Sequence, residues 1–217
     1  FNQMLDRIET LMKEEKEQEA LTRIYELKAL TSQINPHFLY NTLDTIIWMA
    51  EFQDHQKVVD ITKALSNYFR LSLNAGEEIV TLRQEIEHVR QYLFIQKERY
   101  GDKLEYEIDE PDDIPDIKLP KIVLQPLVEN AIYHGIKESE RPGKITITVS
   151  KRDTFIDICI ADNGVGIKEN TTSTKELGGV GIKNIKERLM LFFGEAFSIE
   201  IESEPNAYTK VYLHLPL

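Results

Sequence analysis

The sequence predicts an α+β protein in which an all-α helical hairpin precedes a two-layer α/β sandwich. Apolar residues repeat with a helical period from residue 1 to about residue 100. After Gly101 the pattern changes to the apolar–polar alternation of strands, and helical segments return between the later strands. We therefore expect a signalling or coiled-coil helix over 1–30, a hairpin over 31–80, and a connecting helix with an α/β domain over 81–217.

Composition narrows the possible functions. The formal net charge of −11 over 217 residues argues against a nucleic-acid partner, because the phosphate backbone selects basic surfaces. No apolar run approaches the roughly 20 residues that span a bilayer, so we expect no membrane segment here. The single Cys159 excludes an internal disulfide. Because the chain starts with Phe1 in helical sequence, we expect it to be part of a longer protein.

Two amphipathic helices predict the hairpin. The first carries an apolar stripe at Leu39, Leu43, Ile46 and Ala50, and the second carries one at Val58, Ile61, Leu65 and Phe69. A polar turn is expected between them at 53–56. Such a hairpin cannot bury both stripes by itself, so we expect it to pair with a second copy as a dimeric four-helix bundle.

The later elements follow from caps and periodicity. Thr81 and Gln84 have the spacing of a capping box, which opens a helix that ends at Gly101. Another helix is expected over 121–134, with Pro120 near its start and Gly135 just past its end. The remaining predictions are a helix over 182–193 and strands over 104–108, 144–149, 155–160, 197–201 and 208–215.

A carboxylate in a glycine turn predicts adenine recognition. Asp162 precedes Gly164 and Gly166 in the segment DNGVG. An ionised carboxylate only accepts hydrogen bonds, so it can bind the exocyclic amine of adenine, whereas guanine presents an oxygen there. The glycines let the backbone approach a flat base. The alternative is an ordinary β-turn.

The helix ahead of this turn carries a second group of nucleotide ligands. Asn130 and His134 lie four residues apart in the segment LVENAIYHG and share a flank. An amide oxygen suits Mg²⁺, so Asn130 is the expected metal ligand and His134 a phosphate or ribose neighbour. Glu129, about 100° away on the helix, is assigned to the nucleotide site but not to the metal. The alternatives are an exposed polar residue for Asn130 and a helix-dipole cation for His134.

A glycine-rich helix start completes the expected site. In the segment GGVG, Gly179 and Gly181 open a helix whose free N–H groups can bind phosphates. The polar loop 168–177 is either a lid over the nucleotide or a plain loop.

These three motifs resemble the Bergerat-fold ATP site shared by gyrase, Hsp90, histidine kinases and MutL. With the segment QINPHFLYN at 33–41, the chain resembles LytS-like sensor histidine kinases. The resemblance implies a Bergerat ATP-binding domain that uses ATP and Mg²⁺, a phospho-accepting His37, and a response-regulator partner with a receiver-domain aspartate. It also implies a cytoplasmic portion of a bacterial membrane sensor.

His37 and Asn41 are the expected catalytic residues of the hairpin. Helical spacing places both opposite the apolar stripe, where a second domain can reach them. Phe38 stands where many histidine kinases carry an acidic residue, so Asn41 or Asp44 is a candidate to assist the imidazole. Asn41 could also orient water for dephosphorylation of the partner. Pro36 is either a hinge or the first residue of the helix.

Two departures from related ATPases affect the expected chemistry. Pro126 occupies the position of the water-activating glutamate of gyrase-type enzymes, which favours transfer to a side chain over hydrolysis. Tyr133 occupies a position where related kinases often carry lysine, so the positive charge at the phosphates is expected from Mg²⁺, with Lys137 or Lys183 as further candidates. The rival functions are an ATP-hydrolysing conformational machine and a degenerate nucleotide-binding dimerisation scaffold.

Overall fold

The computed structural model describes residues 36–73, 78–167 and 179–217. The chain divides into two compact units, 1–44 and 45–217, and each is considered by itself. The expected N-terminal helix and the loop 168–177 lie outside the described residues. None of the described helices combines the length and the apolar character needed to cross a bilayer.

The hairpin helices are α2 (Pro36–Glu51) and α3 (His55–Ser72). The described part of α2 begins at Pro36, and the expected cap Asn35 lies outside the described residues. The turn is shorter than predicted, because Gln53 adopts a positive φ of 60° and Asp54 already caps α3 by accepting a hydrogen bond from Lys57 N.

The burial of α2 differs from the prediction. Its buried side chains are Phe38 and Thr42. The side chains expected in a core are instead half-buried or exposed: Leu39, Leu43, Ile46 and Ala50. Trp48 is 64% exposed on the same helix. Periodicity shows where apolar residues line up on a helix, but it cannot tell whether the chain itself covers them.

The connecting helix α4 (Leu82–Tyr100) has the predicted ends. Thr81 and Gln84 form the complete capping box, in which each side chain binds the backbone N–H of the other residue. Gly101 ends the helix with a φ of 58°. Helix α3 packs against α4, so the second hairpin helix belongs to the same compact unit as the α/β domain.

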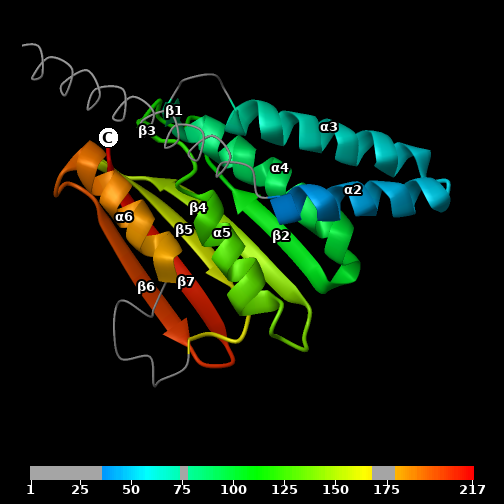
Figure 1. Cartoon of the computed structure of the whole chain (residues 1–217). Helices are drawn as coiled ribbons and strands as arrows, with labels where there is room; N and C mark the ends of the chain where they lie inside the picture. Colours follow the sequence, from blue (N-terminus) through cyan, green and yellow to red (C-terminus); the bar gives the residue numbers. More distant parts are fainter. Residues whose placement is uncertain (1–35, 74–77, 168–178) are drawn as a thin grey trace, which may run out of the picture. The chain divides into compact units, whose positions relative to one another are not determined.

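A five-stranded sheet forms one layer of this unit, in the order β2-β4-β5-β7-β6. Strands β2 and β4 run parallel and the other neighbouring pairs run antiparallel. The helices α4, α5 and α6 cover one face of the sheet (Figure 1). This arrangement confirms the predicted two-layer α+β fold. The strands are β2 (Leu104–Asp109), β4 (Gly143–Lys151), β5 (Phe155–Asp162), β6 (Ser198–Glu204) and β7 (Tyr208–Pro216).

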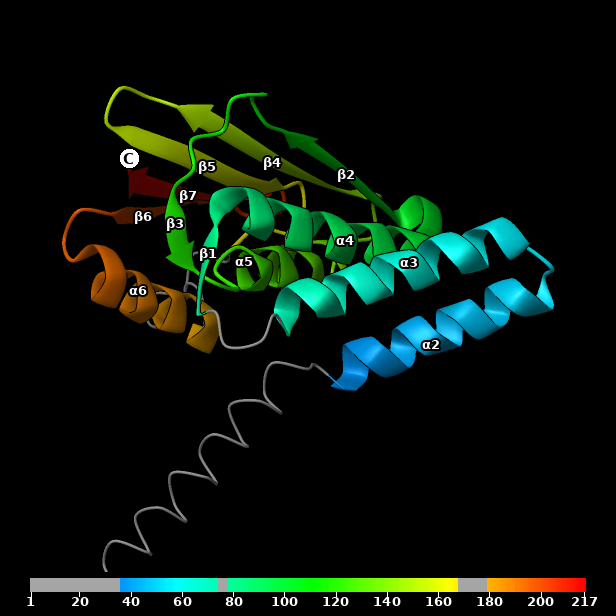
Figure 2. The ribbon, with the colours of Figure 1, turned by 90° about the horizontal axis from the view of Figure 1, so that it is seen from above.

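The alternating sequence explains which face of the sheet is covered. In β5, every second side chain is buried, from Ile156 through Ile158 and Ile160 to Asp162. The apolar members are buried, and Figure 2 shows the helices as a layer along one side of the sheet. Asp162 continues the same inward register, so the pleat of the strand aims its carboxylate at the helical layer.

Two short strands were not predicted. Strand β1 (Ile79–Thr81) pairs antiparallel with β3 (Lys118–Pro120), with Val80 opposite Leu119. Three-residue strands give too few alternations to be seen in sequence, and their pairing is long-range. Pro120 therefore ends a strand rather than starting a helix, which corrects the expected helix start near residue 121.

The remaining helices carry the glycine and asparagine motifs. Helix α5 (Gln125–Asn130) has Pro126 in its first turn and continues into a π-helical segment, Ala131–Ile136. Gly135 therefore lies inside the helical segment, not past its end as predicted. Helix α6 (Gly179–Phe193) ends at Gly194, which has a φ of 62°.

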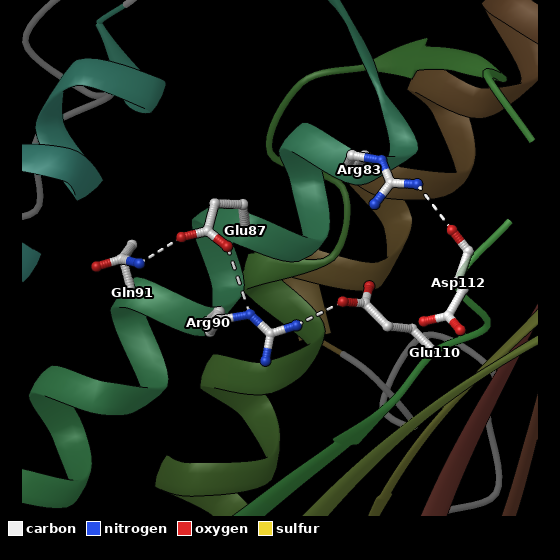
Figure 3. A network of polar contacts seen from close by, with 6 residues as sticks. All are labelled: Arg83, Glu87, Arg90, Gln91, Glu110 and Asp112. Carbon is white, nitrogen blue, oxygen red and sulfur yellow. Dashed lines mark hydrogen bonds and ion pairs between the residues drawn. The ribbon is translucent and has the colours of Figure 1, made fainter. Parts of the chain in front are cut away.

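The acidic loop between β2 and β3 is tied to α4 by polar contacts (Figure 3). Arg90 lies between two carboxylates, with Nη2 2.7 Å from Glu110 Oε1 and Nε 3.4 Å from Glu87 Oε2. Arg83 donates to the carbonyl oxygen of Asp112 at 3.4 Å. These contacts hold the loop that leads into β3 and α5 against the connecting helix.

Candidate functional site

Asp162 and Gly135 bring two of the three nucleotide motifs together. Asp162, the last residue of β5, is only 6% exposed. A Cβ atom at Gly135 would lie 2.5 Å from Asp162 Oδ1, so only glycine fits beside this carboxylate. A Cβ atom at Gly164 would likewise lie 2.3 Å from the Gly135 carbonyl carbon. The backbone bond from Val165 N to Gly135 O, 3.1 Å long, joins the turn to the helix.

The environment of Asp162 suits a buried hydrogen-bond acceptor. Burial raises the pKa of Asp162 to about 6, although the hydrogen bond from Gly164 N acts in the opposite direction. That bond is 2.9 Å long and ends on Oδ1. Near pH 7 the carboxylate is mainly ionised and can accept an amine donor, as its proposed adenine contact requires.

Arg141 anchors the same turn, which sequence reasoning did not find. Its Nη2 atom lies 2.9 Å from Gly164 O, 2.9 Å from Asn206 O and 2.8 Å from Ala207 O. Gly166 has a φ of 65°, and a Cβ atom there would lie 2.1 Å from Glu204 O. The turn is thus pressed onto the β6–β7 connection, where Gly166 is the residue that permits the contact.

The glycine-rich start of α6 lies next to the second motif at Asn130. A Cβ atom at Gly181 would lie 3.6 Å from Asn130 Nδ2 and 4.0 Å from Pro126 Cβ. Asn130 is the last residue of α5 and is half-buried. The N-terminal turn of α6, which begins at Gly179, therefore lies beside the side chain that we expect to bind the metal. These closely packed glycines and the buried carboxylate of Asp162 form an arrangement that fits a nucleotide.

The remaining predicted ligands lie on or near the π-helical segment. His134 and Lys137 are exposed, and Lys137 Nζ lies 5.8 Å from the centroid of the Tyr133 ring. Glu129 is half-buried and accepts a 2.8 Å hydrogen bond from Gln125 Nε2. Short π-helical insertions are common at functional sites, and this one follows Asn130 directly.

The predicted metal ligand of this site is the amide oxygen of Asn130. Among residues 36–73, 78–167 and 179–217, no group of three or more His, Cys, Asp or Glu side chains is arranged to hold a metal ion. Mg²⁺ commonly takes one or two protein ligands together with phosphates and waters. Asn130 fits the role of such a protein ligand.

A buried carboxylate positions the start of α5 and was also missed by sequence reasoning. Glu85 of α4 accepts hydrogen bonds from Ile122 N at 2.5 Å, Val123 N at 2.8 Å and Leu124 N at 3.1 Å. These are the free N–H groups of the segment that enters α5, so Glu85 caps it from another helix. Its sequence signal was a charged residue beside the apolar stripe of α4.

His37 has the exposure that a phospho-acceptor needs. It lies on the first turn of α2 and is exposed, whereas the next residue, Phe38, is buried. Asn41, one turn along, is half-buried and places Nδ2 3.0 Å from His37 Nδ1. The amide therefore contacts the imidazole at Nδ1.

Comparison with known proteins identifies the family. Residues 25–104 match the family model described as histidine kinase, and residues 116–217 match that of the histidine kinase-, DNA gyrase B- and HSP90-like ATPases. The chain belongs to the sensor histidine kinase family. The sensor histidine kinase YesM of Bacillus subtilis is 36% identical over 216 residues, which cover 100% of this chain and 37% of YesM. The sensor protein LytS of Bacillus anthracis is 33% identical over 208 residues, covering 92% and 35% of the two chains.

This histidine kinase chain thus spans just over a third of the length of those relatives. Its fold also matches a solved histidine kinase domain from the Erythrobacter litoralis blue-light activated kinase, with a TM-score of 0.51 and 15% identity. That match covers 88% of this chain and 93% of the solved one. The matches confirm the predicted family and the predicted Bergerat-type fold of the ATPase domain.

Proposed function

We propose that this chain is the kinase core of a two-component sensor. It transfers the γ-phosphoryl group of ATP to His37 and then passes the group to a receiver-domain aspartate of a response regulator. The observation that carries the proposal is the meeting of the three nucleotide motifs, with Gly135 against Asp162 and Gly181 against Asn130.

The nucleotide site divides its work among these residues. Asp162 accepts a hydrogen bond from the adenine amine, and Gly164 and Gly166 let the turn approach the base. The N–H groups of the first turn of α6 bind phosphate oxygens. Asn130 contributes an amide oxygen to Mg²⁺, which neutralises charge on the phosphates when it is bound. His134, Lys137 and Glu129 complete the proposed site around the end of α5.

The acceptor chemistry follows from the bond between His37 and Asn41. The His37 nitrogen that attacks forms a bond to the γ-phosphorus, and the bond from that phosphorus to the bridging oxygen breaks, so that ADP leaves. Attack through Nε2 requires a lone pair there and a proton on Nδ1. In that tautomer His37 Nδ1 donates a hydrogen bond to Asn41. The Asn41 amide turns by half a rotation, so that its oxygen and not Nδ2 faces Nδ1.

Positioning replaces a strong general base in this proposal. Phe38 occupies the position after the histidine and cannot take a proton. Orienting a neutral imidazole and a phosphoryl group can lower the barrier by several kcal/mol, on the order of 7 or more in model reactions. Asn41 is the proposed orienting residue on the acceptor side, and it is also a proposed water-positioning residue when the partner is dephosphorylated.

The assembly and location are also proposals. The incompletely buried apolar stripe on α2 supports a homodimer in which the hairpins of two copies form a four-helix bundle. The proposed setting is the cytoplasmic side of a bacterial membrane sensor.

Radiolabelling tests the function. Incubation with γ-labelled ATP and Mg²⁺ should place acid-labile, alkali-stable label on the wild-type chain and none on His37→Ala. Phosphate release without protein labelling would support the gyrase-like machine instead. Nucleotide binding with neither labelling nor release would support the scaffold.

A further inference from the structure

A buried hydrogen-bond bridge joins the second hairpin helix to the nucleotide helix. Tyr68, in the penultimate turn of α3, is 2% exposed. Its hydroxyl oxygen accepts a 2.8 Å hydrogen bond from Nε2 of Gln125, the first residue of α5. The same Nε2 donates at 2.8 Å to Oε1 of Glu129, one turn further along α5. The two hydrogens of one amide are thus shared between α3 and the residue that precedes Asn130.

The α3 end of the bridge is held firmly. The Tyr68 ring stacks on the His88 ring of α4, with centroids 4.6 Å apart and an angle of 14° between the planes. His88 Nε2 lies 2.7 Å from Ser72 Oγ. Burial raises the pKa of Tyr68 to about 12 and lowers that of His88 to about 4, so both rings are neutral near pH 7. A neutral phenol keeps its place as a hydrogen-bond acceptor for Gln125.

The α5 end of the bridge is where backbone geometry changes. Regular α-helix ends at Asn130 and the π-helical segment begins at Ala131. Glu129 is half-buried there and accepts the hydrogen bond from Gln125 Nε2. Loss of this bond would leave a half-buried carboxylate without its Gln125 donor, beside the proposed metal ligand.

We propose that Gln125 and Tyr68 are positioning residues that fix the turn of α5 carrying Asn130, and that they couple Mg²⁺ binding to the placement of α3. This inference rests on the proposed ATP–Mg²⁺ site. Because coupling free energies are reciprocal, Mg²⁺-nucleotide binding would also stabilise the present contact between α3 and α5. The bridge gives the hairpin a direct contact with the nucleotide helix.

Magnesium titrations on the complete chain, with a fluorescent ATP analogue, test the proposal. Tyr68→Phe removes the acceptor of the bridge and Gln125→Met removes its donor, and each variant keeps a side chain of similar size. Each should raise the half-saturating Mg²⁺ concentration by about 3- to 10-fold, consistent with the loss of one buried hydrogen bond. The double variant should resemble the singles, because both changes break the same connection.

Tyr92→Phe is the matched control. Its hydroxyl is equally buried but accepts a 2.8 Å hydrogen bond from Gln96 within α4. It should leave the Mg²⁺ requirement unchanged. An equal shift in Tyr92→Phe, unchanged values in both bridge variants, or a double variant equal to the product of the singles would each overturn the inference. Absence of nucleotide binding by the wild type would instead refute the proposed function, so the two failures are distinguishable.

Discussion

Gly135 lies so close to Asp162 that a methyl group at residue 135 would sit 2.5 Å from the carboxylate oxygen. The oxygen concerned already accepts the Gly164 N–H, so it cannot turn away without breaking that bond. The contact fixes the carboxylate that we propose to bind adenine to the helical segment that follows Asn130. Helix and turn can therefore bind one nucleotide together.

Gly135→Ala should weaken ATP binding by about 10-fold or more, because the added methyl group displaces the Asp162 carboxylate from its hydrogen bond. Isothermal titration with a non-hydrolysable ATP analogue measures the effect. Gly194→Ala is the control, since Gly194 has a φ of 62° at the end of α6 and should lose stability of about 1 kcal/mol without a comparable loss of affinity. Equal affinities for Gly135→Ala and wild type would contradict the packing argument.

ATP binding should weaken as the pH falls through about 6, because the pKa of Asp162 is raised to about 6 by burial. The protonated form loses an acceptor that the adenine amine requires. Asp162→Asn should bind more weakly at pH 7.5, by about 10-fold or more, and should lose this pH dependence. Titrations from pH 5 to 8 compare the two proteins, and a parallel decline in both would assign the dependence to another group.

The same pKa predicts an opposite trend in stability. Between the ordinary value of 3.8 and about pH 6, the folded protein retains a proton that the unfolded chain has released. The free energy of unfolding should therefore fall as the pH rises through this window, by about 3 kcal/mol at most. Asp162→Asn should lack this decline in urea unfolding curves measured from pH 4 to 7. A wild-type curve that matches the variant at every pH would show that Asp162 is not buried in this way.

Glu85→Ala should lower the free energy of unfolding by about 3 kcal/mol or more, because it leaves the N–H groups of Ile122, Val123 and Leu124 without their buried acceptor. Glu87→Ala on the same helix is the control. Its carboxylate is exposed in the network of Figure 3, so its loss should cost under about 1 kcal/mol. Similar costs for the two variants would count against Glu85 as the cap of α5.

Replacing Asn41 tests how the imidazole is oriented. Asn41→Ala should slow autophosphorylation by about 10-fold while nucleotide affinity stays constant, because His37 loses the group 3.0 Å from Nδ1. Asn41→Asp should restore at least part of the rate, since a carboxylate accepts the Nδ1 proton. Initial rates of labelling measure both. If Asn41→Ala labels as fast as wild type, another group orients His37. A separate assay of dephosphorylation of the phosphorylated regulator tests the water-positioning role.

Local sequence signals were sufficient for most elements of the fold. Thr81 and Gln84 predicted both the start and the complete cap of α4, because a capping box involves residues three apart. The alternation in β4 and β5 predicted both strands. These features can be predicted because they depend on residues close together in the sequence. The family resemblance, which the glycine and histidine motifs carry, depends on such local segments as well.

Long-range contacts decided what the sequence left open or misplaced. Helix α5 starts at Gln125, later than predicted, because Pro120 belongs to β3. The N–H groups that follow Pro120 are bound by Glu85, a residue of α4. The anchoring by Arg141 and the bridge through Tyr68 also join residues more than twenty positions apart. Residue types and periods therefore determined the elements and the chemistry available to this protein. Only the tertiary structure determined which polar groups meet, because a buried donor finds its partner through the packing of whole elements.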